Sequence, residues 1–356
     1  MPDSSGKFLL HKKSKDGYSG YFKALVSLAL LSSLLHPPLT VAPMTWTLTR
    51  FVFGILCFQD IRFVNPYLFT KMLTSLSPLI IIPHYILTNP FGYGAYRYAG
   101  FYGDPNFMAI ALLLLIVSAY ITIKVERDVF WSFIGYFVII SAIPLIFVGM
   151  SRGGLTGLGL IVFIMLSDLW KTNKKVFSFI VACFVFSIGS VVAEFSELLE
   201  YIGERFLNES GSDEYSTLAR WYGVQSALTV FVNYPIVIPF GIGLGNTVSS
   251  AHEYVQYGCF YKSEIHNTFI SLMYEGGVFM FFVYVSVYWK LFMGFLKYRN
   301  YLLIAMLVSL FISLNTLPGA SFMPGWISLF LLCNQRILII SKYDECKNSN
   351  TLYLYR

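Results

Sequence analysis

Long apolar runs are the feature that most constrains how this chain folds. Runs of about 17 residues or more recur along it, and a helix of that length crosses a bilayer core of about 30 Å. Only 12% of the residues are charged and 56% are hydrophobic, whereas soluble domains carry about 25% charged residues. We therefore predict an all-α integral membrane protein with about ten transmembrane helices. The expected spans are 22–41, 43–59, 67–87, 106–123, 129–149, 154–170, 176–194, 268–289, 301–317 and 325–341.

These spans divide the chain into three parts. Residues 1–192 hold about seven N-terminal transmembrane helices. Residues 193–267 form one large extracytoplasmic loop, and residues 268–356 hold the C-terminal transmembrane helices and a cytoplasmic tail. The basic N-terminal stretch leads into a full-length apolar span without a small-residue cleavage site, so we expect no cleavable signal peptide.

The distribution of Lys and Arg predicts the orientation, because cytoplasmic loops of membrane proteins are enriched in these residues. With both termini in the cytoplasm, the cytoplasmic segments hold most of the 25 basic residues. The exceptions are Arg50, Arg97, Arg152, Arg205, Arg220 and Lys262. We therefore attribute the net charge of +6 to anchoring at the cytoplasmic side, and expect no nucleic-acid partner.

The cysteines and histidines show no metal-site spacing. Five cysteines are present, and only Cys259 faces outward in the predicted topology. No disulfide within the chain is therefore expected outside the membrane. We predict neither a metal nor a cofactor.

The large loop is the place where a folded subdomain outside the membrane is expected. Residues 216–235, STLARWYGVQSALTVFVNYP, predict a helix with one broad face suited to the membrane interface. That face holds Leu218, Trp221, Tyr222, Gln225, Leu228 and Val232. The glycine-rich FGIGLGN at 240–246 predicts a turn and not a dinucleotide site, because no strand precedes it.

Arg152 stands out among the outward basic residues. It lies in GMSRGG, 149–154, where Gly153 and Gly154 precede an expected helix start. Helix N-termini attract anions, and a guanidinium group can hold a phosphate through two N–H groups. This pattern predicts contact with a lipid phosphate or diphosphate at the membrane surface. Arg205 and Lys262 are instead expected to pair with acidic residues of the loop.

Arg50 and Glu275 are the charged residues that lie farthest from the ends of the expected spans. Arg50 lies near the middle of the membrane, and Glu275 lies nine residues beyond His266, about 13 Å deeper along a helix. Charges inside a membrane are costly and usually face a partner. A buried Arg50–Glu275 ion pair and a catalytic role for Glu275 are equal alternatives.

His266 begins HNTFISLMYEGG, where the large loop re-enters the membrane, and Glu264 and Asn267 flank it. A histidine at this place could take a proton from a hydroxyl near neutral pH. A lone histidine at an interface is also a common amphipathic anchor. The residues alone leave both interpretations open, and His252 in the loop is a competing histidine.

Four blocks of sequence, taken in order, resemble one family. They are RYAGFYGDPN (97–106), SRGG (151–154), ARWYG (219–223) before FGIGLGN (240–246), and HNTFISLMYEGG (266–277). Together they are similar to the O-antigen polymerase and O-antigen ligase superfamily, over about residues 93–290. The resemblance implies a GT-C-like glycosyltransferase at the outer face of the bacterial inner membrane. It also implies a glycan donor on undecaprenyl diphosphate, no metal, and inversion at the anomeric carbon.

The resemblance further implies roles for individual residues. Arg152 and Arg220 would contact the diphosphate, and His266 would act as the base or orient the acceptor. Arg97, Asp104 and Asn106 match a block of polymerase-like members, and we assign them donor-sugar or diphosphate contacts. Supporting roles fall to Glu264, Asn267, Glu275 and Arg50. All four blocks are intact, but ten spans is fewer than many members have.

Two reactions are compatible with the resemblance. A polymerase joins lipid-linked repeat units into O-antigen or capsular polysaccharide, whereas a ligase transfers the polysaccharide from undecaprenyl diphosphate to lipid A–core. The Asp-Pro-Asn block and the compact chain favour the polymerase. The expected partners are the lipid-linked donor and acceptor and membrane lipid, with a chain-length regulator protein as a further candidate. A transporter of lipid-linked glycan is a remote alternative, because the spans show no paired inverted repeats.

Overall fold

The structure is a computed structural model of the chain. It describes residues 18–35, 66–88, 90, 98–126, 128–172, 174–175, 177–178, 221, 224–225, 227–244, 265–315, 317, 325, 327–329 and 331–333. Within these ranges the chain forms helices and turns, and no strand. The helices are α1 (Ser19–Leu35), α3 (Pro66–Leu87), η2 (Gly100–Tyr102), α4 (Pro105–Glu126), α5 (Val129–Gly149), α6 (Arg152–Thr172), η3 (Pro235–Val237), α11 (Thr268–Lys297) and α12 (Tyr301–Leu314).

Four of the described helices are long and apolar enough to cross a membrane: α4, α5, α6 and α11. Shorter apolar helices occupy Gly20–Leu35 and Tyr301–Leu314. These helices confirm the prediction of a helical protein with several segments that could span a membrane. The count of about ten spans stays a prediction, since the expected span 43–59 and most of 176–194 and 325–341 lie outside the described residues.

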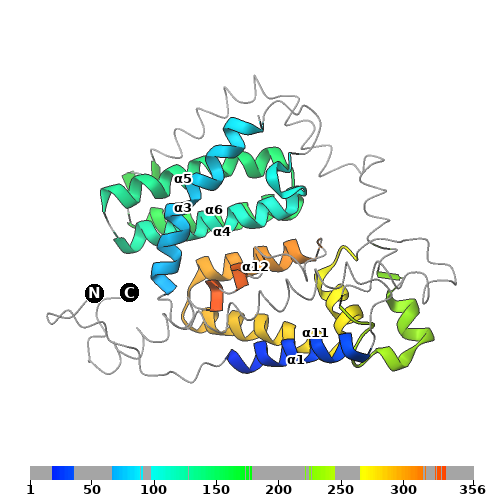
Figure 1. Cartoon of the computed structure of the whole chain (residues 1–356). Coiled ribbons are helices and arrows are strands. Elements are labelled where there is room, and N and C mark those ends of the chain that lie inside the picture. The colour runs from blue at the N-terminus through cyan, green and yellow to red at the C-terminus, as the bar shows by residue number, and fades with distance from the viewer. Residues whose placement is uncertain are drawn as a thin grey trace, which may run out of the picture.

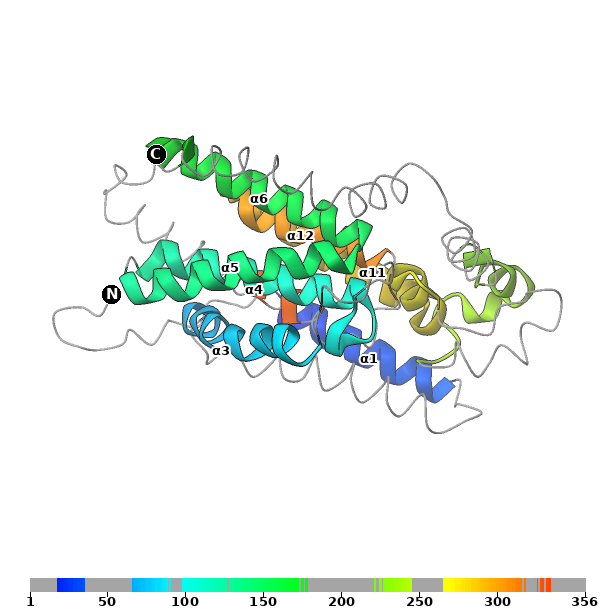
Figure 2. The ribbon, with the colours of Figure 1, turned by 90° about the horizontal axis from the view of Figure 1, so that it is seen from above.

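The helices lie in two groups (Figure 1), with α3, α4, α5 and α6 in one and α1, α11 and α12 in the other. Helix α12 joins the groups, because it packs against α4 and α6 on one side and against α11 on the other. Seen from above, most of these helices still run along one common direction (Figure 2). The helices therefore form one bundle, and their termini gather at its two opposite ends.

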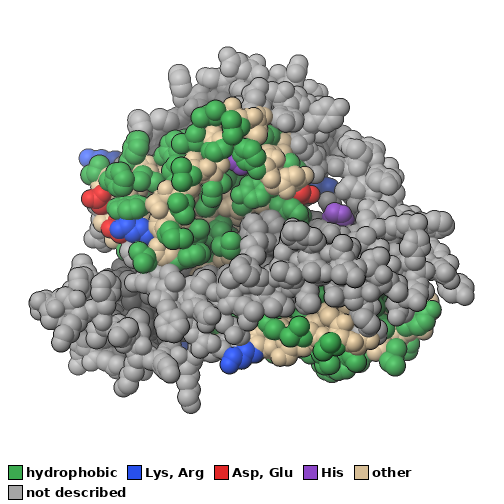
Figure 3. All heavy atoms as spheres, viewed as in Figure 1, with side chains coloured by type: hydrophobic (Ala, Val, Ile, Leu, Met, Phe, Trp, Pro, Cys, Tyr) green, Lys and Arg blue, Asp and Glu red, His purple; other side chains and the backbone are tan. Residues whose placement is uncertain are grey.

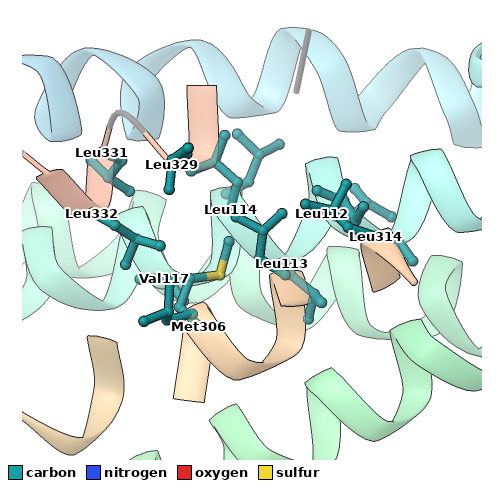
Figure 4. Close-up of a cluster of buried hydrophobic side chains, with 14 of the residues drawn as sticks. Leu112, Leu113, Leu114, Val117, Met306, Leu314, Leu329, Leu331 and Leu332 are labelled. Atoms are coloured by element: carbon teal, nitrogen blue, oxygen red, sulfur yellow. The ribbon is translucent and has the colours of Figure 1, made fainter. Parts of the chain in front are cut away.

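Helix α4 occupies the centre of this bundle. It is apolar around its whole circumference, and most of its side chains are buried, as expected of a helix enclosed by others. Figure 4 shows how its leucines meet the neighbouring elements. Leu112, Leu113, Leu114 and Val117 of α4 lie in one buried cluster with Met306, Leu314, Leu329, Leu331 and Leu332.

Helices α6 and α12 approach each other through small residues. A Cβ atom placed on Gly153 would lie 3.4 Å from the Cα atom of Ser313, and one on Gly157 would lie 2.8 Å from the Cβ atom of Ser309. The two glycines of α6 are four residues apart, as are the two serines of α12, and this spacing of small residues lets helix backbones come close in membranes. The contact brings the first turn of α6 beside the last turn of α12.

Basic residues are concentrated at one end of the bundle, which we call the lysine end. Here Lys71 of α3 pairs with Glu126 of α4 at 2.5 Å, and Lys124 pairs with Asp168 of α6 at 2.6 Å. The other described Lys and Arg residues at this end are Lys23, Lys171, Lys174, Lys175, Lys290, Lys297 and Arg299. Arg152, on the first turn of α6, is the one described Lys or Arg at the opposite end. We call that end the Arg152 end.

The segment before η3 partly confirms the predicted interface helix. Trp221, Leu228 and Val232, three of the residues assigned to one face, are exposed. Ala227, Val230 and Phe231 are buried against residues that include Ile242 and Tyr274. The contact of the exposed face with the membrane stays a prediction.

Candidate functional site

The block GDPN turns the chain into α4 at the Arg152 end. Gly103 has φ +69°, a left-handed conformation that glycine adopts without strain. The carboxylate of Asp104 then accepts a hydrogen bond of 2.7 Å from the backbone N–H of Asn106. Pro105 stands at the first helical position, where no backbone donor is needed. Asp104 therefore serves as a cap for α4, in addition to any contact with a ligand.

Asn106 joins this block to the start of α6. The hydroxyl of Ser151 donates a hydrogen bond of 2.6 Å to Oδ1 of Asn106, and the same hydroxyl accepts one of 3.1 Å from the N–H of Gly154. Asn106 is 7% exposed and Ser151 1%. A Cβ atom on Gly154 would lie 2.4 Å from the Cβ atom of Ala109. These contacts fix the first turn of α6, and with it the half-buried Arg152.

Replacing Ser151 with alanine is expected to lower the free energy of unfolding by about 1–3 kcal/mol, because Oδ1 of Asn106 would be left buried without this donor. Thermal unfolding in detergent measures the change. Ser167→Ala is the matched control on the same helix, since its exposed hydroxyl bonds only the carbonyl of Phe163. Equal melting temperatures for the two variants would contradict the role given to Ser151.

Asn267 and Thr268 tie the start of α11 to the end of α12. Oδ1 of Asn267 accepts hydrogen bonds from the N–H groups of Phe269 and Ile270, at 3.0 and 3.1 Å. Its amide nitrogen donates to Asn315 at 3.3 Å, and the Thr268 hydroxyl donates to the carbonyl of Leu317 at 2.8 Å. Asn267 is thus an N-cap, and His266 lies half-buried directly before it.

The structure brings Arg152 and His266 to the same end of the bundle. Gly153 lies against Ser313 of α12, and Asn315, just beyond α12, bonds Asn267. In the view of Figure 3, acidic, basic and histidine side chains lie close together on the right of the upper part of the described surface. Asp104, Asn106, Arg152, His266 and Asn267 therefore share one region, which we call the candidate site.

Glu275 lies deeper, where α11 is broken. The backbone of Gly277 has φ +82° and ψ 172°, which is not helical. The carbonyl of Glu275 accepts hydrogen bonds from the Ser32 hydroxyl at 2.6 Å and from the N–H of Gly243 at 2.9 Å. The glycine-rich turn expected at 240–246 is confirmed at Gly241 and Gly243, which both have positive φ. It docks on this break, a contact that the sequence did not reveal.

Gly277→Ala is expected to destabilise the fold by about 2–4 kcal/mol. The backbone conformation is one that essentially only glycine adopts, and a Cβ atom would lie 2.2 Å from the carbonyl oxygen of Pro239. Chemical or thermal unfolding in detergent checks this. Gly159→Ala, where no atom lies within 4 Å of the added Cβ, should be neutral or slightly stabilising. A harmless Gly277→Ala would show that the loop does not dock here.

Four predicted site residues lie outside the described residues: Arg50, Arg97, Arg220 and Glu264. The approach of Arg97 and Arg220 to Arg152 stays a prediction. So does the choice between an Arg50–Glu275 ion pair and a catalytic Glu275. The Glu275 side chain is almost fully buried, with 5% of the residue exposed.

His84 is a buried polar residue at the candidate-site end that the sequence reading did not single out. It lies on the last turn of α3, is 0% exposed, and contacts the segment that leads to Asp104. The signal available in the sequence was PHYILTNP, 83–90, a histidine between two prolines shortly before the block RYAGFYGDPN.

Among the described residues, no group of three or more His, Cys, Asp or Glu side chains could hold a metal ion. The polar groups of the candidate site are instead amides, hydroxyls, one carboxylate, one guanidinium and one imidazole. Such a set suits the recognition of an anion and of sugar hydroxyls.

Comparison with known proteins gives one match. Residues 136–285 match a protein-family model described as O-antigen ligase. The match runs from the middle of α5 to the middle of α11, so it includes Arg152, Arg220, His266 and Glu275 but not Arg97, Asp104 or Asn106. No curated protein matches the chain.

Proposed function

We propose that this chain, which belongs to the O-antigen ligase and polymerase superfamily, polymerises oligosaccharide repeat units carried on undecaprenyl diphosphate. The observation that carries the proposal is the shared position of Arg152 and His266. They lie at one end of the bundle within the matched region, and the other described Lys and Arg residues lie at the opposite end. An anion-binding group and a proton acceptor at one end are what glycosyl transfer from a lipid diphosphate requires.

Arg152 is proposed to bind the leaving diphosphate. Its guanidinium can hold two phosphate oxygens, and it stands at the N-terminus of a 21-residue helix, where free N–H groups favour an anion. Positive charge placed where negative charge develops lowers the barrier more than it strengthens ground-state binding. Arg220, and Arg97 with Asp104 and Asn106, are proposed as further contacts to the diphosphate or the donor sugar.

His266 is proposed to accept the proton of the incoming hydroxyl. The hydroxyl oxygen attacks the anomeric carbon of the donor, the bond from that carbon to the diphosphate oxygen breaks, and the electron pair leaves with the diphosphate. The proton passes to the imidazole, and the configuration at the anomeric carbon inverts. Asn267 supports this step by capping α11 and so fixing the backbone next to His266. No metal takes part in the proposed scheme.

The proposed location is the bacterial inner membrane, with the lysine end and both termini in the cytoplasm. This placement satisfies the excess of basic residues in cytoplasmic loops. It puts the candidate site at the outer face, where lipid-linked repeat units would meet. Because donor and acceptor are both anchored in lipid, a site at the ends of the helices can hold them together and supply part of the acceleration through proximity.

A ligase is the second candidate, favoured by the description of the matching family model. It would transfer the finished glycan from undecaprenyl diphosphate to lipid A–core with the same two groups. Arg152 and His266 do not distinguish the two acceptors. The Asp-Pro-Asn block and the compact chain are the reasons for placing the polymerase first.

Loss of the protein from its host, followed by gel separation of the lipopolysaccharide, tests the proposal. A polymerase predicts core carrying one repeat unit in place of the long ladder. Core without any O-antigen would instead identify a ligase. An unchanged ladder would contradict both.

A further inference from the structure

The imidazole of His84 is enclosed by the segment that leads into α4. Its Nδ1 lies 2.5 Å from the hydroxyl of Tyr98. The ring stacks on Tyr102, with centroids 6.0 Å apart and planes 11° apart, and meets Phe101 edge-on at 4.9 Å. Burial raises the pKa of the Tyr102 hydroxyl, so this side of the ring is covered by a neutral aromatic group at physiological pH.

The backbone is shaped to admit this ring. Gly100 has φ +53°, and a Cβ atom there would lie 2.2 Å from Cε1 and 2.4 Å from Nδ1 of His84. The segment therefore passes directly over the imidazole, at a position where only glycine leaves room. Close approach of backbone to a side chain is one of the specific uses of glycine.

A polar network holds the same ring in place. The Tyr98 hydroxyl lies 2.5 Å from the hydroxyl of Thr88, which donates to the carbonyl of His84 at 2.6 Å. Nε2 of His84 is buried and has no hydrogen-bond partner among the described residues. A buried unpaired nitrogen costs free energy. A phenylalanine would fill similar space without that cost, so the hydrogen bond to Tyr98 is the contribution that distinguishes the imidazole.

Two further hydrogen bonds connect the His84–Tyr98 pair with the neighbourhood of Arg152. The N–H of Tyr98 donates to the carbonyl of Val148 at 3.2 Å, near the end of α5. Eight residues after Tyr98, Asn106 accepts the hydrogen bond from Ser151, the residue before Arg152. The segment 98–106 therefore connects the end of α3 with the first turn of α6.

We infer that His84 is a positioning residue of the candidate site: its bond to Tyr98 fixes segment 98–106, and this segment sets where Arg152 presents its guanidinium. His84 is fully buried, so it acts through the segment and not on the substrate. The inference rests on the proposed function, because Arg152 is taken as the diphosphate contact.

Binding of undecaprenyl diphosphate to the purified protein in detergent is the first test. His84→Phe is expected to raise the Kd roughly three- to tenfold, which corresponds to the loss of one hydrogen bond, and Tyr98→Phe should raise it at least as much, because it also removes the contact with Thr88. The double variant should bind about as weakly as Tyr98→Phe, since that change already removes the bond to His84 along with the contact to Thr88. His84→Asn keeps a polar group near Nδ1 and should recover much of the affinity.

Tyr85→Phe is the matched control. The Tyr85 hydroxyl bonds the carbonyl of Ser141 at 2.5 Å, so this change removes a bond of the same length from the neighbouring residue of α3 and leaves the hydrogen bond between His84 and Tyr98 in place. It should leave the Kd unchanged. An unchanged Kd for Tyr98→Phe, or an equal rise for Tyr85→Phe, would overturn the inference.

Kinetics with a lipid-linked repeat unit separate positioning from a general loss of structure. Positioning predicts that Tyr98→Phe both raises the KM for the donor and lowers kcat at an unchanged melting temperature, because Arg152 is proposed to hold the diphosphate in the bound substrate and more strongly in the transition state. A fall in kcat that follows the melting temperature, with KM unchanged, would instead show a merely structural role. If wild type binds the diphosphate but forms no glycosidic bond, the proposed function fails while the weaker binding of Tyr98→Phe still supports the placement of Arg152.

Discussion

Replacing His266 with alanine should abolish long-chain glycan, with kcat lowered by about 10²–10⁴-fold. This is the range that a positioned general base contributes. The residue is half-buried and precedes the cap of α11, so its removal should leave the fold intact. A glycan ladder from cells that carry the variant at normal protein level measures the effect, and normal chain length would refute the assignment.

Two variants sharpen this test. His252→Ala removes the competing histidine of the loop and should keep full activity. Asn267→Ala removes the cap and should lower the free energy of unfolding by about 1 kcal/mol, with a smaller loss of activity than His266→Ala. If His252→Ala alone destroyed activity, the role of the base would move to the loop.

Arg152→Lys should lose nearly as much activity as Arg152→Ala, by about 10²–10³-fold in kcat. An ammonium keeps the charge but lacks the two-pronged geometry that holds a diphosphate, and removal of one such stabilising donor costs this much in other enzymes. Turnover of a lipid-linked repeat unit by purified protein gives the measurement.

Arg299→Lys is the matched control for this change. Arg299 lies at the lysine end, between α11 and α12, where no part of the candidate site is placed. The same substitution there should leave turnover unchanged. Full activity in Arg152→Lys would argue against a bidentate diphosphate contact.

The sequence predicted the long helices well, because the apolar runs report the length that must be buried in lipid. The expected span 129–149 coincides with α5, and 154–170 falls within Arg152–Thr172. The largest difference is in α11, expected at 268–289 but extending to Lys297. Its last turns begin near Lys290, whose charge ends an apolar window without ending the helix.

The break inside α11 and its partners could not be predicted in the same way. Gly276 and Gly277 can be read from the sequence, but the contacts of Glu275 cannot. Ser32 lies 243 residues from Glu275 along the chain, and Gly243 lies 32 residues from it. Periodicity describes one helix face at a time. It carries no information on which distant loop completes a broken helix.

The sequence named residues of the candidate site, whose roles stay predictions, but not the contacts between them. Asn106, Arg152, His266 and Asn267 were all named from the sequence, and the structure places them at one end of the bundle. The hydrogen bonds between Ser151 and Asn106 and between His84 and Tyr98 arise from packing between elements that are distant in the sequence. The bond from Ser151 gives Asn106 a structural role, and the cap at the start of α4 gives one to Asp104; their sequence block disclosed neither.

The most direct test of the account is transfer by the purified protein in lipid vesicles. The substrate is one defined repeat unit on undecaprenyl diphosphate, and mass spectrometry with analysis of the new linkage follows the product. We predict lipid diphosphate carrying two or more repeat units joined with inversion, formed by wild type and not by Arg152→Lys or His266→Ala. Movement of the lipid-linked unit without a new glycosidic bond, or equal product from all three proteins, would contradict the account.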